Sequence, residues 1–114
     1  GCGMSVVMKR RRVPLPPAYR QFKKEFPAIA EAYERLGEAC HWQGPLEPKT
    51  RELIKLGIAV GAGLEGATRS HVRRALEAGA TPEEIRHAAL LATTTIGFPS
   101  MMRAMRWVGD VLGK

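Results

Sequence analysis

Residues 67–85, ATRSHVRRALEAGATPEEI, contain the clearest structural signals in the chain. Gly79 suits the left-handed conformation that ends many helices, so a helix is expected over about Ala67–Ala78. Thr81-Pro82-Glu83-Glu84 combines a threonine cap, a proline at the first helical position and a glutamate three residues after the cap. That combination predicts the start of another helix. The stretch therefore predicts a helix, a tight turn and a second helix.

Apolar residues at helical spacing extend through most of the chain. Before the quoted stretch the pattern predicts helices over Tyr19–Phe26, Pro27–Cys40 and Pro48–Val60. After it, the helix that starts at Thr81 continues to Ile96, and a last helix follows the interruption at Gly97-Phe98-Pro99. Because no segment shows clean strand alternation, we expect an all-α, single-domain bundle of about five to six helices.

The spacing also predicts which side chains are buried and where helices cross. The helix that starts at Pro27 is expected to bury an apolar face made of Ile29, Ala30, Tyr33, Leu36 and Cys40. The helix that starts at Thr81 is expected to bury a second face, made of Ile85, Ala88, Ala89, Ala92 and Ile96. Gly57 and Gly61 lie four residues apart, and glycine weakens a helix, so this pair predicts a close crossing by another helix.

Length and composition exclude several classes of protein. The chain has 114 residues, which is enough for one domain but not for an enzyme with a separate cofactor domain. It contains no apolar stretch long enough to span a membrane. The formal net charge is +7, and four of the positive charges come from Lys9, Arg10, Arg11 and Arg12. Since no aromatic residues are interleaved with this run, we interpret it as a solvated arm, and nucleic-acid binding is not expected.

The N-terminus and the cysteines bear on cellular location. Residues 1–14 are expected to be a disordered arm, in which residues 1–3 resemble an added leader before a native start at Met4. Cys2 and Cys40 are too few for a disulfide framework or a cysteine-rich metal site. Val6-Val7-Met8 is too short for a secretory signal, so a cytoplasmic location is expected. The three histidines lack paired ligand spacing, so no metal site is expected.

A glycine motif at residues 61–66, GAGLEG, matches the dinucleotide-binding pattern G-x-G-x-x-G. That function requires a preceding strand and a surrounding βαβ unit. Here the preceding segment has a helical pattern, and no parallel strands are predicted. We therefore interpret the glycines as a tight turn between helices rather than as a nucleotide site.

Glu52 and His71 form the candidate chemical pair. They lie on consecutive predicted helices that can run antiparallel, so the turn between the helices can bring them together. A buried carboxylate beside an imidazole can orient it and exchange protons with it. The same pair can equally be a structural ion pair, and the residue types alone leave both interpretations open.

Two blocks of sequence resemble the carboxymuconolactone decarboxylase family, which includes the AhpD-like alkylhydroperoxidases. They are residues 44–54, GPLEPKTRELI, and residues 69–85, RSHVRRALEAGATPEEI. The resemblance covers about residues 44–96, and it implies that residues 15–114 form an AhpD-like helical domain. It further implies assembly into homotrimers or homohexamers. Peroxidase members use an acidic residue, a Cys-x-x-Cys pair and a histidine, which here implies Glu52 as the acid and His71 as the histidine.

The chain departs from that family pattern at the two cysteine positions, which hold Leu64 and Ala67. Neither side chain can form a thiolate or a disulfide. The family resemblance then favours acid–base chemistry without a cofactor, of the decarboxylase or lactone-acting type, with Glu52 and His71 catalytic. Leu64 and Ala67 are expected to line the pocket beside this pair. Arg51 or Arg69 could hold a small carboxylate ligand.

Two other functions remain open at this stage. One is a protein of the peroxidase branch with redox activity lost or altered through Cys40. The other is a non-catalytic oligomeric binding protein. By itself Cys40 is expected to be a small buried hydrophobe, Trp42 to pack against other residues, and His87 to lie at the surface or an interface. Assembly is also expected because the last helix carries more apolar residues than one small core can cover, namely Met101, Met102, Met105, Trp107 and Val108.

The replacement of both family cysteines predicts that the protein does not turn over organic hydroperoxides through a thiol. The measurement is a peroxide-consumption assay with thiol reductants, run on the wild type and on Cys40→Ser. Robust activity that disappears in Cys40→Ser would contradict the prediction and identify Cys40 as a nucleophile.

Overall fold

Six α-helices and one short 3₁₀ helix make up the regular structure of residues 15–113, the part of the chain that the computed structural model describes. No strand occurs in this part, as expected for an all-α fold. The expected basic arm, with Lys9–Arg12, falls in residues 1–14, outside the described residues. The elements are α2 (Pro17–Glu25), α3 (Pro27–Trp42), α4 (Pro48–Ala62), α5 (Glu65–Glu77), α6 (Pro82–Leu90), η1 (Leu91–Thr94) and α7 (Phe98–Leu112).

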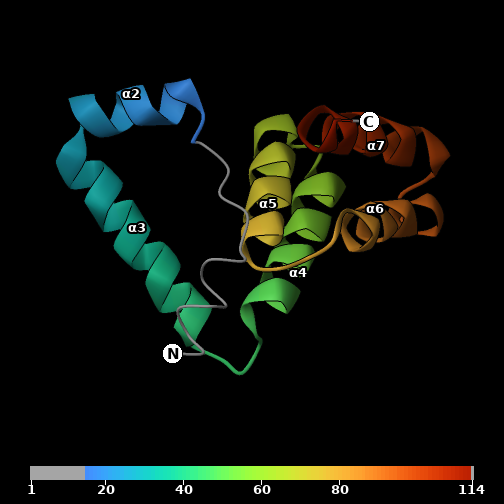
Figure 1. The fold of residues 1–114 in the computed structure, drawn as a ribbon, viewed down its shortest axis with the longest axis horizontal. Helices are drawn as coiled ribbons and strands as arrows, with labels where there is room; N and C mark the ends of the chain where they lie inside the picture. Colours follow the sequence, from blue (N-terminus) through green and yellow to red (C-terminus); the bar gives the residue numbers. More distant parts are fainter. Residues whose placement is uncertain (1–14, 114) are drawn as a thin grey trace.

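Helices α4 to α7 form the body of the molecule, which Figure 1 shows as two packed pairs. Helices α4 and α5 make the most extensive contact, and α7 packs across α5, α6 and η1. The core between these elements is made of apolar side chains, of which the largest that are fully buried are Leu56, Val72, Ile85 and Val108. This core fixes α4 against α5, the two helices that carry Glu52 and His71.

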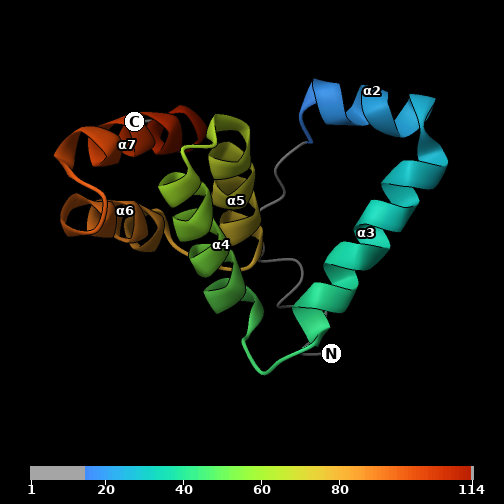
Figure 2. The ribbon, with the colours of Figure 1, turned by 180° about the vertical axis from the view of Figure 1, so that it is seen from behind.

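Helices α2 and α3 extend away from the body, as both Figure 1 and Figure 2 show. Ala30 is the one buried residue of these two helices. The expected burial of α3 is therefore wrong for Ile29, Tyr33 and Leu36, each about 60% exposed, and for Cys40, which is also exposed. The reason is that, among the described residues, no element of the same chain covers this apolar face.

Gly63 and Gly79 end helices α4 and α5 with positive φ angles, of 70° and 98°, as the turn signals predicted. The motif at residues 61–66 joins α4 to α5, so the tight turn is confirmed. The close helix crossing at Gly57 and Gly61 is wrong, because a side chain added at either glycine would meet nothing within 4 Å. Within the described part of this chain no other helix packs against Gly57 or Gly61, and both glycines are exposed.

The C-terminal helices differ from expectation in two places. Helix α6 ends at Leu90 and continues as the 3₁₀ helix η1, so Ile96 lies beyond it and is exposed rather than buried. The apolar surplus expected on the last helix is mostly absent, because Met101, Trp107 and Val108 are buried in the chain's own core. Among the described residues no helix is long and apolar enough to cross a membrane.

The capping box at the start of α6 provides a direct test of the local fold. The Glu84 backbone N–H donates to Thr81 Oγ1 at 3.0 Å, and the Thr81 N–H donates to Glu84 Oε1 at 2.9 Å. Thr81→Ala removes the first of these bonds and should lower the free energy of unfolding by about 1 kcal/mol, the usual value of such a cap. Thr94→Ala, at an exposed position in η1, is the matched control. Equal unfolding midpoints for the two variants in urea would contradict the prediction.

Candidate functional site

Glu52 and His71 meet across the packed pair α4 and α5. Glu52 is buried, with 5% of its surface exposed, and its Oε1 lies 2.9 Å from His71 Nδ1. The Gly63 turn reverses the chain between them, so both side chains face the junction of the two helices. Because an ionised carboxylate can only accept hydrogen bonds, Nδ1 of His71 must carry a hydrogen and donate it to Glu52. The Nε2 atom of His71 is then left for other partners.

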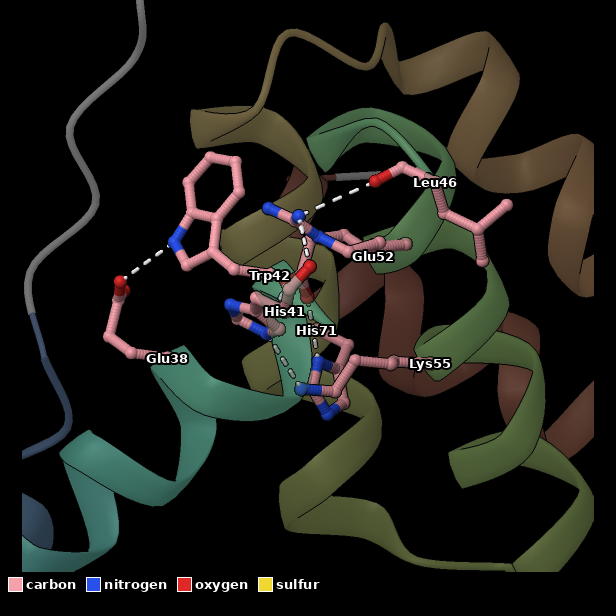
Figure 3. Close-up of polar contacts among 8 residues, drawn as sticks. Glu38, His41, Trp42, Leu46, Glu52, Lys55 and His71 are labelled. Carbon is pink, nitrogen blue, oxygen red and sulfur yellow. Dashed lines mark hydrogen bonds and ion pairs between the residues drawn. The ribbon is translucent and has the colours of Figure 1, made fainter. Parts of the chain in front are cut away.

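Sequence reasoning missed two further members of this cluster, His41 and Lys55. Figure 3 draws them with Glu52 and His71 at the end of α3. Glu52 Oε2 lies 3.6 Å from His41 Nε2, which in turn lies 3.1 Å from Lys55 Nζ. Lys55 follows Glu52 by three residues on α4 and therefore shares its face, a spacing signal visible in the sequence. No sequence signal points to His41, because its approach depends on how α3 meets the body.

The protonation state of His41 follows from its neighbour Lys55. A charged ammonium group has three donors and no acceptor, so Nε2 of His41 must accept the hydrogen bond from Lys55. The remaining ring hydrogen then lies on Nδ1, and the imidazole is neutral. Burial lowers the pKa of His41, and the charge of Lys55 lowers it further, while Glu52 partly offsets both. The two histidines beside Glu52 therefore play different roles: His71 donates to the carboxylate and His41 accepts from the lysine.

The cluster links stability to pH. Burial acts to raise the pKa of Glu52, but the hydrogen bond from His71 and the charges of His71, Lys55 and Arg74 outweigh it and hold the pKa below its ordinary value of 4.5. The stabilisation from Glu52 is therefore present above that value and is lost as the pH falls through the folded-state pKa. His41 has a folded-state pKa below 6.5, so the unfolded chain takes up its proton first. Both groups make acidification destabilising.

The guanidinium group of Arg51 binds other groups of the same chain. Its Nη1 donates to the His41 carbonyl at 2.6 Å and to the Leu46 carbonyl at 3.4 Å, and its guanidinium lies 4.9 Å from the centre of the Trp42 ring. Arg51 thereby fastens the C-terminal end of α3 to α4. Trp42 is 68% exposed and packs in no core; its ring N–H donates to Glu38.

The structure does not bring Arg69 into the cluster. Its guanidinium pairs with Glu65 and, at 2.6 Å, with Asp110 of α7. Leu64, at one family cysteine position, is 53% exposed and caps the start of α5. Ala67, at the other, is half-buried one turn before His71.

Neither Glu52 nor His71 lines either of two cavities in the described part of the chain. One, of about 310 Å³, is lined by residues of α2, α3 and α5, including Ala67 and Ser70. The other, of about 510 Å³, lies between α4, α6 and η1, and exposed His87 lines it together with apolar side chains. Within residues 15–113 no group of three or more histidine, cysteine, aspartate or glutamate side chains has a geometry that could hold a metal ion.

Comparison with known proteins identifies relatives of this chain. The model of the carboxymuconolactone decarboxylase family matches residues 27–110. A nitrosuccinic acid decarboxylase of Metarhizium robertsii is 40% identical over 78 residues, which cover 64% of this chain and 54% of that protein. An uncharacterised protein of Methanocaldococcus jannaschii is 28% identical over 91 residues, covering 80% of this chain and 85% of its own length.

A third relative, an uncharacterised protein of Haemophilus influenzae, is 38% identical over 58 residues, or 51% of each chain. The present chain thus spans about half the length of the Haemophilus and Metarhizium proteins. No solved structure matches it.

The geometry of the cluster predicts how His41 responds to the loss of the carboxylate. The negative charge of Glu52 raises the pKa of His41 against burial and Lys55, so Glu52→Gln should lower that pKa further. The measurement is an NMR titration of His41 in both proteins, with Glu31→Gln, an exposed position on α3, as the control of equal charge change. An unchanged or higher pKa of His41 in Glu52→Gln would show that the two groups do not interact in solution.

Proposed function

Because the chain belongs to the carboxymuconolactone decarboxylase family, we propose that it decarboxylates a small carboxylate by acid–base chemistry without a cofactor. The family and the 40% identity to a decarboxylase support a decarboxylase-like function. The observation that carries the proposal for the site is the 2.9 Å contact between buried Glu52 and His71. A lactone-acting reaction uses the same pair and remains an alternative within this proposal.

Glu52 acts in this proposal as a positioning residue for His71. Its carboxylate accepts from Nδ1 and so fixes both the ring orientation and the position of the proton. The imidazolium form of His71 can donate a proton from Nε2. His71 is then the group that touches the reacting carbon, and Lys55 adds a positive charge to the same cluster.

The chemical step breaks the bond between the carboxylate carbon and the neighbouring carbon of the substrate. Carbon dioxide leaves, and the electron pair of the broken bond remains on the substrate, in an electron-withdrawing group such as a nitro or carbonyl group. His71 then donates the proton of Nε2 to the carbon, where the pair forms the new C–H bond, and water restores the proton to His71. The net reaction takes up one proton for each carbon dioxide released.

The relative from Metarhizium suggests a class of substrate. Its printed name assigns it nitrosuccinic acid, a dicarboxylic acid in which a nitro group can take up the electron pair. We extend this chemistry to the present chain as a small dicarboxylate with an electron-withdrawing group beside the carboxylate that is lost. The substitution of Leu64 and Ala67 for the family cysteines supports this reaction over peroxide reduction.

Self-association forms part of the proposal. Among the described residues, α3 exposes Ile29, Tyr33 and Leu36, and the cavity between α4, α6 and η1 is lined largely by apolar side chains. Exposed apolar surfaces of this kind often mark contacts between protein chains. The family resemblance favours three or six copies. A cytoplasmic location stays a prediction from the sequence.

The proposed reaction predicts the effect of removing the proton donor. His71→Gln should lower the rate of carbon dioxide release from nitrosuccinate by about 10²–10⁴-fold, the usual contribution of a positioned acid or base. Glu52→Gln should lower it less, because His71 remains and the amide oxygen can still accept from Nδ1, while the negative charge beside the ring is lost. His87→Gln is the matched control, since His87 is exposed and lies outside the cluster. The product formed in D₂O should carry one deuterium at the carbon that lost the carboxylate.

The outcomes separate catalysis from other functions. Equal rates for wild type and His71→Gln, with both proteins folded, would contradict an acid–base role for His71. No release above the uncatalysed rate by the wild type, with nitrosuccinate and with related 3-oxo acids and lactones, would favour a non-catalytic binding protein.

The exposed apolar surfaces predict a homo-oligomer. Multi-angle light scattering at micromolar concentration should give a mass of three or six times 12.5 kDa. Leu36→Lys, in the exposed face of α3, should shift this mass toward the monomer, because a charge in an apolar interface is costly. Glu31→Lys, on the same helix, changes charge in the same direction and is the control. A stable wild-type monomer would contradict the prediction.

A further inference from the structure

We propose that the cavity between the α2–α3 arm and α5 binds a carboxylate of a small dicarboxylic acid, with Arg73 and Arg74 as its cationic partners. The inference rests on the proposed function and names where its substrate is held. The carboxylate that is retained would lie on the two arginines, and the one that is lost would lie toward His71.

The cavity has a suitable size and lining. Its volume is about 310 Å³, which accommodates an organic acid of four or five carbons. Helix α5 contributes Ala67, Ser70, Arg73 and Arg74, while Tyr19 and Tyr33 face them from α2 and α3. The lining thus combines two cations with hydroxyl groups and aromatic rings.

The two arginines differ from the other arginines near the site in lacking partners. Within residues 15–113 the guanidinium group of neither Arg73 nor Arg74 makes a hydrogen bond or an ion pair, and residues 1–14 contain no aspartate or glutamate. Arg51 and Arg69, which the sequence suggested for this role, already bind carbonyl or carboxylate oxygens of the protein. Free guanidinium groups suit the two oxygens of a carboxylate ligand.

Electrostatics favour an anion at this position. Arg73 is half-buried, and burial together with the adjacent charge of Arg74 lowers its pKa, so the pair carries a repulsion that an anionic ligand would relieve. Glu77 also lines the cavity and opposes this effect, but it leaves an excess of one positive charge among the lining residues. Glu34 lies near the cavity as well, where it is paired with Tyr19 and Lys23.

The cavity adjoins the Glu52–His71 pair through α5. Ala67 and Arg74 lie four residues before and three residues after His71, so all three share one face of the helix. The charge of Arg74 also reaches Glu52, whose pKa is raised by burial and lowered by His71, Lys55 and Arg74. Ala67 and Arg74 of the cavity lining therefore lie one turn before and one turn after His71 along α5.

The test uses succinate, a dicarboxylate without an electron-withdrawing group, so that binding is measured without turnover. Succinate should shift the backbone amide signals of Ala67 and Ser70 in two-dimensional NMR spectra of the full chain at millimolar concentration. The double variant Arg73→Gln/Arg74→Gln should weaken this binding at least about tenfold, since the charge-assisted hydrogen bonds to the carboxylate are lost. Succinamide, the neutral analogue, should not bind.

Two control variants keep the result specific. Arg106→Gln removes one exposed charge from α7 and should bind succinate as the wild type does. Arg73→Lys/Arg74→Lys keeps the charge without the two-pronged geometry and should retain part of the affinity. Circular dichroism establishes that each variant is folded before binding is compared.

The outcomes distinguish this inference from the proposed function. Binding of succinate that the double glutamine variant leaves unchanged, or shifts confined to residues outside the cavity, would overturn the inference even if decarboxylation is observed. The absence of binding to the wild type would also overturn it. Arginine-dependent binding of succinate would support the site even if no decarboxylation occurs, in which case the proposed function alone fails.

Discussion

The buried carboxylate of Glu52 is the constraint on which the rest of the site depends. An ionised carboxylate removed from water costs several kcal/mol unless charged or hydrogen-bonding groups replace its hydration. Here His71 of α5 donates a hydrogen bond, and Lys55 of α4 contributes a positive charge. His41, at the end of α3, holds Lys55 near the carboxylate by accepting its hydrogen bond. The burial of one side chain therefore requires the α4–α5 packing and the attachment of α3 together. Arg51 contributes to this arrangement, because it holds the end of α3 against α4 by donating to the His41 carbonyl.

The same constraint makes the two histidines unequal, and this asymmetry is what acid–base chemistry needs. His71 donates to Glu52 through Nδ1, whereas the ammonium group of Lys55 keeps His41 neutral. One site thus holds a potential proton donor beside a neutral imidazole. Arg73 and Arg74, in the cavity beside α5, add positive charge that could bind an organic acid. In this account the cluster supplies the proton, and the adjacent cavity supplies recognition.

Local signals in the sequence predicted much of this structure, and non-local contacts account for what they missed. The caps at Gly79 and Thr81 act within a few residues, so the helix boundaries near them were predictable. The pairing of Glu52 with His71 followed from resemblance and from the Gly63 turn. His41 was missed because only the approach of α3 brings it to Glu52. The burial of Ile29, Tyr33 and Leu36 was wrong because helical periodicity identifies an apolar face but not whether the same chain covers it.

The most direct test of this account is the ¹⁵N NMR spectrum of the histidine side chains at neutral pH, which reports the protonation of each ring nitrogen. We expect His41 to be a neutral imidazole with its hydrogen on Nδ1 and a bare Nε2 facing Lys55, and His71 to carry a hydrogen on Nδ1. Lys55→Met should release His41 from this state. A hydrogen on Nε2 of His41, or a bare Nδ1 on His71, would contradict the claim that the buried carboxylate and the lysine assign the two histidines their roles.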